Sequence, residues 1–412
     1  MHTLKRQLAH WLYAAESLAH VENMASDDAW KGLHDTTAVI MKQYLQNNIS
    51  HLVNKGKKLQ DQLIHINTNE VRGQLRKAIL RYKADYLKIE TTIHFYTDAI
   101  NTRTNSQTAL ILKGCDVLCN ECLHLFLTPL NKLLPAVISY LDKGAGAAIM
   151  KAGLRLWDGS LSPAALIKIT FHNLRQPTAL LHECGHQIAH VLHWNKELSK
   201  TLFTNLEYKD KAVAKAFSNW SSEIAADAIA LVTTGFAAVA ALHDVVDGEG
   251  GMVFHYDAND PHPISYLRVL LNCAFCNCLF GKGSWDDMTL QWKQNHPLTD
   301  CDEGTRKLII KATTYLPLIA EVILKQPQIA FGNKAISSLI NISKVAPITL
   351  GKLNDAYVQN PNYVQNCTAL QMVALTGYRV GIGIGNVKTD LKNMQNYLIK
   401  IGNQNIQHYS LN

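Results

Sequence analysis

The run HECGH at residues 182–186 constrains the local fold and the chemistry of this chain more than any other segment. A proline and a threonine precede it, and apolar residues recur around it at helical spacing, so the run is predicted to lie in an α-helix. His182 and His186 are four residues apart, which puts both rings on one helical face within reach of a single metal ion. Glu183 is expected to point into the same site and to polarise a water molecule there.

The segment WSSEIAADA at residues 220–228 supplies two carboxylates at the same helical spacing. Its serines suit a helix N-cap and its small apolar residues favour a helix, so Glu223 and Asp227 are expected on one face. Zinc in hydrolases usually has three protein ligands, and a histidine ligand usually donates its second ring N–H to a carboxylate. Glu223 therefore fits the third ligand to zinc, and Asp227 fits the carboxylate that orients a histidine.

An HExxH helix followed by a helix carrying ExxxD resembles the gluzincin clan of zinc metallopeptidases. The segment DPHPISYLRV at residues 260–269 is similar to the HP…R segment of the prenyl-protease and heat-shock-protease branch of that clan. The resemblance covers roughly residues 160–275 and implies that His262, helped by Tyr266 or Arg268, stabilises the oxyanion during hydrolysis. Two other roles remain open: His262 could cap the following helix, and Arg268 could serve only as a salt-bridge residue.

The predicted reaction is hydrolysis of a peptide bond, with Zn²⁺ as cofactor and a peptide or protein as substrate. Glu183 would act as the general base, which takes a proton from the attacking water and passes it to the leaving amine. Two alternatives remain open. The chain could be a catalytically latent regulatory module that binds zinc without turnover, or a zinc-dependent amide or ester hydrolase that acts on a small molecule.

The predicted fold class is mainly α with a small β element. Residues 165–172 alternate apolar and polar side chains and include β-forming residues, which predicts a strand directly before the HExxH helix. The resemblance implies that this is an edge strand along which a peptide binds by strand addition. We therefore expect a zincin-like catalytic domain at 106–300, built from the edge strand, the HExxH helix and the ExxxD helix. Helical regions at 1–105 and 301–412 would flank it.

Composition argues against several other classes of protein. The net charge of +7 is mild for 412 residues and no dense run of Lys and Arg occurs, so nucleic-acid binding is not expected. The longest uncharged apolar run spans about 15 residues, fewer than the roughly 20 that a membrane span needs. The N-terminus lacks the pattern of a signal peptide, and nine cysteines are an odd number, which together favour a reduced, cytoplasmic protein.

Two clusters of cysteines could hold a second metal. One has a spacing found in iron–sulfur sites and the other is equally compact in the sequence. The clusters are Cys115, Cys119 and Cys122, and Cys273, Cys276 and Cys278. Both lie in apolar segments, so packing within helices is the favoured interpretation and a second metal site is the alternative.

Overall fold

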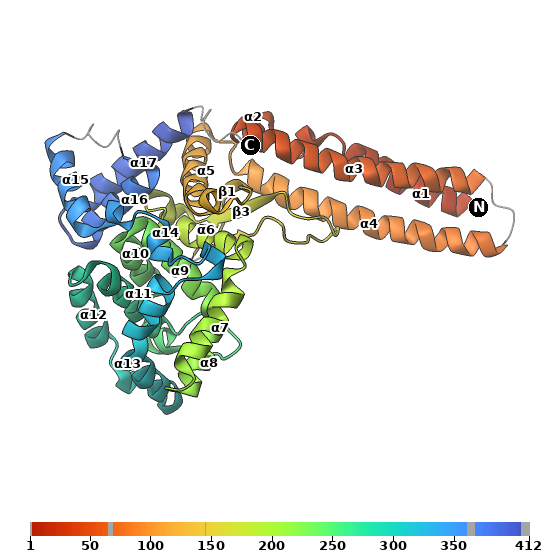
Figure 1. The fold of residues 1–412 in the computed structure, drawn as a ribbon. Helices are drawn as coiled ribbons and strands as arrows, with labels where there is room; N and C mark the ends of the chain where they lie inside the picture. The colour runs from red at the N-terminus through yellow and green to blue at the C-terminus, as the bar shows by residue number, and fades with distance from the viewer. Residues whose placement is uncertain (1, 65–68, 145, 361–366, 405–412) are drawn as a thin grey trace. The chain divides into compact units, whose positions relative to one another are not determined.

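The computed structural model describes residues 2–64, 69–144, 146–360 and 367–404. Helices dominate these ranges, and three short strands form one small sheet (Figure 1). The predicted fold class, mainly α with a small β element, is therefore confirmed. Within the described ranges, no helix has both the length and the apolar content that crossing a membrane requires.

The chain divides into two compact units that are not the predicted ranges. Unit 1 comprises Met1–Lys113, Pro135–Leu141 and Met150–Leu166. Unit 2 comprises Gly114–Leu134, Asp142–Ile149 and Ile167–Asn412, and so contains both predicted ligand segments. The division at about residues 105 and 300 stays a prediction about which parts fold separately.

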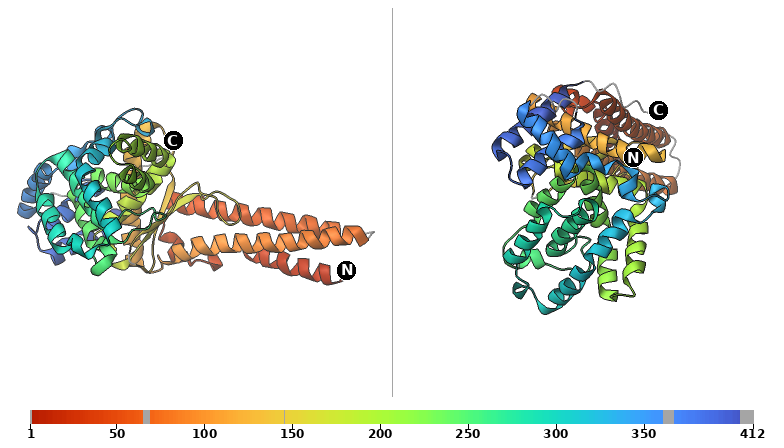
Figure 2. Two further views of the ribbon diagram at one scale, coloured as in Figure 1. Left: turned by 90° about the horizontal axis from the view of Figure 1, so that it is seen from below. Right: turned by 60° about the vertical axis from the view of Figure 1, so that its left-hand side comes forward.

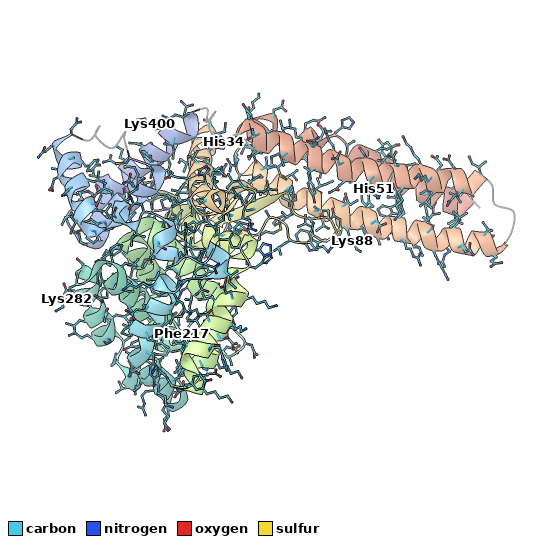
Figure 3. The ribbon with its side chains drawn as sticks, viewed as in Figure 1. His34, His51, Lys88, Phe217, Lys282 and Lys400 are labelled. Carbon is cyan, nitrogen blue, oxygen red and sulfur yellow. The ribbon has the colours of Figure 1, made fainter. Side chains whose placement is uncertain are left out.

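Long amphipathic helices form most of unit 1. They are α1 (His2–Ser17), the short η1 (Val21–Asn23) and α2 (Asp27–Lys31), α3 (Asp35–Ile64) and α4 (Asn69–Asn101). α3 and α4 lie side by side, and α1 packs against both (Figures 1 and 2). Buried side chains recur every three or four positions, as at Met41, Leu45, Ile49 and Leu52 of α3. Polar side chains such as His51 and Lys88 cover the exposed faces (Figure 3).

The sheet places the predicted strand in its middle. Its members are β1 (Ala136–Leu141), β2 (Ala148–Met150) and β3 (Ala164–Ile169), in the order β1-β3-β2. The strand before the HExxH helix is present as β3, but the expectation of an edge strand there is wrong, because β3 pairs on both sides. The burial pattern of β1 does not alternate and β2 has only three residues, so neither partner strand leaves a clear alternation in the sequence.

From residue 106 onward the helices belong largely to unit 2. In chain order they are α5 (Ser106–Leu127), η2 (Thr128–Leu130), η3 (Phe171–Arg175), α6 (Thr178–Val191), α7 (Trp194–Leu206), α8 (Lys211–Asn219), α9 (Ser221–Thr234), α10 (Phe236–Val246), η4 (Gly250–Phe254), α11 (Ser265–Phe280), α12 (Ser284–Asn295), η5 (Leu298–Asp300), α13 (Glu303–Lys325), η6 (Ile329–Phe331), α14 (Ile336–Leu339), η7 (Ile342–Val345), α15 (Pro347–Gln359), α16 (Ala369–Gly381) and α17 (Val387–Asn403).

Helix α9 is the buried helix of unit 2 and positions the ligand segments. Every residue of α9 except Ser222 is buried, because α6, α7, α10, α11 and α16 pack around it (Figure 1). α6 lies very close to α9 at Gly185, where a Cβ atom would lie 2.7 Å from the Cα atom of Ala226. Glycine within the HECGH run therefore lets the two ligand helices come close enough for their polar faces to meet. Phe217 of α8, labelled in Figure 3, packs against Trp220 directly before α9.

Candidate metal centre

Three predicted ligands converge between α6 and α9. The candidate ligand atoms of His182, His186 and Glu223 all lie within 4.8 Å of one another. Nε2 of His182 lies 3.3 Å from one carboxylate oxygen of Glu223, and Nε2 of His186 lies 3.1 Å from the other. Two imidazoles and one carboxylate are a donor set that zinc takes in hydrolases, so the residues present fit this metal. The group could hold a metal ion.

Asp227 lies on the far side of the His182 ring from Glu223. Its Oδ1 atom is 2.8 Å from Nδ1 of His182, the nitrogen that does not face the cluster. An acceptor there fixes the tautomer in which Nε2 carries a free lone pair. Arg268 donates to both oxygens of Asp227 at 2.7 Å, and Asn272 donates to one of them at 3.2 Å. Asp227 therefore lies at the ring nitrogen of His182, where the sequence predicts the carboxylate that orients a histidine.

His186 has a different orienting partner, which sequence reasoning missed. Oγ of Ser222 lies 3.4 Å from Nδ1 of His186, and Nδ2 of Asn195 donates to that same oxygen at 3.3 Å. The expectation that the serines cap α9 is wrong, because Trp220 is the N-cap residue and makes no side-chain cap bond. Ser222 precedes the ligand Glu223 in the helix, and this adjacency was the only signal in the sequence. Asn195 lies on α7, and the sequence around it contains no pattern that indicates a contact with the site.

Charge dominates the electrostatics of the cluster. Burial alone would lower the pKa of His182, but hydrogen bonds to Asp227 and Glu223 outweigh burial and raise this pKa to about 9. Burial alone would raise the pKa values of the two carboxyl groups. The histidines at Glu223 and the charge of Arg268 at Asp227 instead hold both values well below their usual range. The carboxylates around His182 thus favour its protonated form.

Glu183 lines the cavity that contains these residues. The cavity has a volume of about 580 Å³, and its lining includes His182, Glu223 and Asp227. Glu183 is only 7% exposed, and burial raises the pKa of its carboxyl group. A buried carboxylate with a raised pKa beside the cluster is suited to accepting a proton near neutral pH.

His262 reaches the edge of the cluster. Its Nε2 atom lies 3.8 Å from Glu223, and its Nδ1 atom lies 2.6 Å from Oδ1 of Asp260. The side chain is 58% exposed and lines the cavity. It does not cap the following helix, since Ile264 is the N-cap residue of α11 and no side-chain cap bond forms. The capping alternative is therefore wrong for His262.

Tyr266 does not reach the cavity, which corrects the expectation that it assists at the oxyanion. It is buried in an aromatic cluster, with ring centres 5.3 Å from Phe254 and 6.5 Å from Trp292. Residues two apart in a helix point in directions about 200° apart, so Tyr266 and Arg268 cannot both face the ligands.

Arg268 is a salt-bridge residue within the site. It is 9% exposed and donates to Asp227 and, at 3.2 Å, to Glu223. Burial alone would lower the pKa of its guanidinium, but the two carboxylates raise it above its usual value. Because these bonds hold it in place, Arg268 orients the ligand and its neighbour rather than presenting a free donor to an oxyanion. Asn272, four residues later on the same face, completes the arrangement.

The cysteine clusters lie elsewhere in the helices. The thiols of the first cluster are buried in α5, and Cys184 of α6 lies 3.9 Å from the carbonyl oxygen of Cys119. The second cluster lies in α11, with Cys278 half-buried. Within the described parts of the chain, the only group of three or more histidine, cysteine or acidic ligand atoms that converges is the one at His182, His186 and Glu223.

Comparisons with known proteins identify no relative of this chain: no family model, no curated protein and no solved structure matches it.

Proposed function

We propose that this chain is a zinc-dependent peptidase with a gluzincin-like catalytic core formed by α6, α9 and α11. The observation that carries the proposal is the convergence of His182, His186 and Glu223 within 4.8 Å, with Asp227 on the second nitrogen of His182. A chance cluster of charged helices has no reason to supply both a three-atom donor set and the orienting carboxylate. These residues would hold the ion, and a bound zinc ion would supply Lewis acidity for amide hydrolysis.

Glu183 is the general base in this proposal. Its carboxylate takes a proton from the attacking water molecule and delivers that proton to the nitrogen of the leaving amine. Burial supports this role because it raises the pKa of the carboxyl group towards the pH at which proton transfer in both directions is efficient.

His262 is the donor to the developing oxyanion. Its Nδ1 atom lies 2.6 Å from Oδ1 of Asp260, and this contact holds the ring in place. The other ring nitrogen, Nε2, lies 3.8 Å from Glu223 and is the atom that would donate to the oxyanion. Such a donor stabilises negative charge that exists only in the transition state.

A peptide is the substrate that the surroundings of the site favour. Gly146 and Ala147 line the cavity and directly precede β2, which lies at an edge of the sheet. An extended peptide can add to such an edge through backbone hydrogen bonds, whereas a small molecule lacks the extended backbone that would pair with the strand. In this proposal the substrate therefore pairs with β2, and not with the strand predicted at residues 165–172.

The test is to measure zinc content and peptide cleavage on the same preparations. The zinc-loaded chain is expected to cleave members of a peptide library, and Glu183→Gln is expected to retain zinc while its rate falls about 10²–10⁴-fold. Glu121→Gln is the matched control, because Glu121 of α5 is a carboxyl group whose pKa burial also raises, outside the site. Cleavage that survives in Glu183→Gln would remove Glu183 as the base. Zinc binding without cleavage of any library member would favour the latent module.

A further inference from the structure

The cavity at the metal centre continues along α10 towards the surface. Its lining includes Ala230 of α9 and, on α10, Ala238, Ala241, Leu242 and Val245. Exposure rises along α10, since Ala238 is 9% exposed, Ala241 and Leu242 are half-buried, and Val245 is 51% exposed. The seven residue steps from Ala238 to Val245 span roughly 10 Å, or about two helical turns. The α10 wall thus leads from the buried ligands to solvent.

We propose that this wall binds a neutral, apolar side chain of the substrate, adjacent to the bond that is cleaved. This inference rests on the proposed hydrolase function and names its substrate class. Alanines at positions 230, 238 and 241 leave space where larger side chains would fill it, and Leu242 offers apolar contact. A cavity of about 580 Å³ lies within the usual range for ligand sites, which bind mainly through apolar walls.

Charge at the same wall selects against an anionic group. Among the described residues that line the cavity, Arg268 is the only lysine or arginine, and its bonds to Asp227 and Glu223 already engage it. Asp244, at the exposed end of the α10 wall, adds a negative charge. A free C-terminal carboxylate would therefore meet no lysine or arginine that is available to pair with it there. The substrate side chain is uncharged, and the bond cleaved lies within a chain rather than before its last residue.

Hydroxamates of increasing chain length test this wall through binding alone. Acetohydroxamate, butyrohydroxamate and hexanohydroxamate are titrated calorimetrically into the zinc-loaded full-length protein. Affinity is expected to increase about fourfold for each methylene that becomes buried. Adipic acid monohydroxamate has the same number of carbon atoms as hexanohydroxamate, with a carboxylate in place of the terminal methyl group. It is expected to bind at least about tenfold more weakly, because burying an uncompensated carboxylate is unfavourable.

Substitutions on α10 locate the binding wall. Ala238→Leu and Ala241→Leu are expected to remove the dependence on chain length while leaving acetohydroxamate affinity and zinc content unchanged. Leu242→Ala enlarges the same space and is expected to weaken hexanohydroxamate binding by removing apolar contact. It remains informative if a leucine variant fails to fold. Ala212→Leu is the matched control, since Ala212 is an exposed alanine of α8 that does not line the cavity.

The outcomes separate this inference from the function on which it rests. Absence of zinc and of acetohydroxamate binding would overturn the proposed metal centre. Zinc binding with equal affinity for all three neutral hydroxamates would overturn the apolar wall and leave the metal centre standing. A chain-length dependence that persists in both leucine variants would place the apolar contact away from α10.

Discussion

Two buried arginine–carboxylate pairs in unit 2 share their chemistry and differ in their surroundings. Arg268 of α11 pairs with Asp227 of α9, and Arg379 of α16 pairs with Asp390 of α17 at 3.1 Å. Each of the four side chains is less than a tenth exposed. Arg379 otherwise contacts the amide of Asn354 and the face of the Tyr357 ring, which are neutral groups. One positive and one negative charge therefore balance in that pair.

The pair at Arg268 carries a surplus of negative charge. Three buried carboxylates, those of Glu183, Glu223 and Asp227, surround a single arginine. Burying unpaired charge is unfavourable, so this surplus persists only where another cation compensates it. The raised pKa of His182 indicates that the site attracts a proton when no metal is present. A balanced buried pair thus needs no further charge, whereas the group beside the unbalanced pair could hold a metal ion.

Loss of a ligand is expected to have the largest effect. His186→Ala removes one of three protein ligands and should reduce zinc from about one ion per chain to a trace after dialysis. His190→Ala, on the same helix but outside the cluster, is expected to retain zinc. Elemental analysis of both variants measures the difference. Full zinc retention in His186→Ala would show that the unbalanced region is not the metal site.

Breaking each arginine pair compares the two regions directly. Arg268→Met and Arg379→Met should each destabilise the metal-free protein by about 3–5 kcal/mol, because each leaves a buried carboxylate without its partner. Zinc is expected to restore much of the lost stability in Arg268→Met alone, since only there can the ion replace the missing positive charge. Melting temperatures with and without zinc measure this rescue. Equal rescue of the two variants would contradict the distinction between the regions.

The sequence predicts the parts of the site that depend on helical periodicity. His182 and His186, and Glu223 and Asp227, share faces because four residues make about one turn, and the structure brings all four together. Asn272 follows Arg268 at the same spacing and could have been found in this way. Tyr266 could have been excluded by the same reasoning. It lies two residues before Arg268, so the two side chains point in nearly opposite directions from the helix.

Contacts between distant segments could not be predicted in this way. Asn195 reaches Ser222 only because α7 packs beside α9, and no pattern within either helix records that packing. The central position of β3 likewise depends on its pairing with β1 and β2, and the sequence does not specify which strands pair. Gly185 occupies a variable position of the HExxH run, and nothing in the motif indicates that its lack of a side chain is what allows α6 to approach α9.

His262 offers the next test, because it lies at the rim of the unbalanced region. His262→Ala should lower kcat by about 10²–10³-fold with little change in KM, as expected for a donor that acts in the transition state. Zinc content and melting temperature should hardly change, since the side chain is 58% exposed. Steady-state kinetics on the zinc-loaded variant decide this. A rise in KM at constant kcat would instead assign His262 to substrate binding.

The two aspartates provide a matched pair with a smaller effect. Asp227→Asn should weaken zinc binding about 10–100-fold, the usual consequence of changing the group that orients a histidine ligand. Asp390→Asn is expected to lower the melting temperature and leave zinc affinity unchanged, because Arg379 is its only charged partner described here. Competition with a fluorescent chelator measures both affinities. Equal zinc affinity in the two variants would mean that Asp227 has no role at the metal.

For a change of one pH unit, the pH dependence of zinc binding is expected to be the smallest of these effects. Histidine binds zinc as a neutral ring, and the pKa of His182 in the metal-free site is raised to about 9. A raised pKa means that the proton stabilises the metal-free fold fully below the pKa of unfolded histidine, about 6.5, and that this contribution is lost as the pH rises through about 9. Between these values zinc must displace the proton, so zinc affinity should fall up to about tenfold for each pH unit below 9. Calorimetry at pH 7 in two buffers of different ionisation enthalpy should detect about one proton released per zinc ion bound. Absence of proton release would mean that the negative charge at His182 is compensated in another way, and the contrast with the balanced Arg379 pair would weaken accordingly.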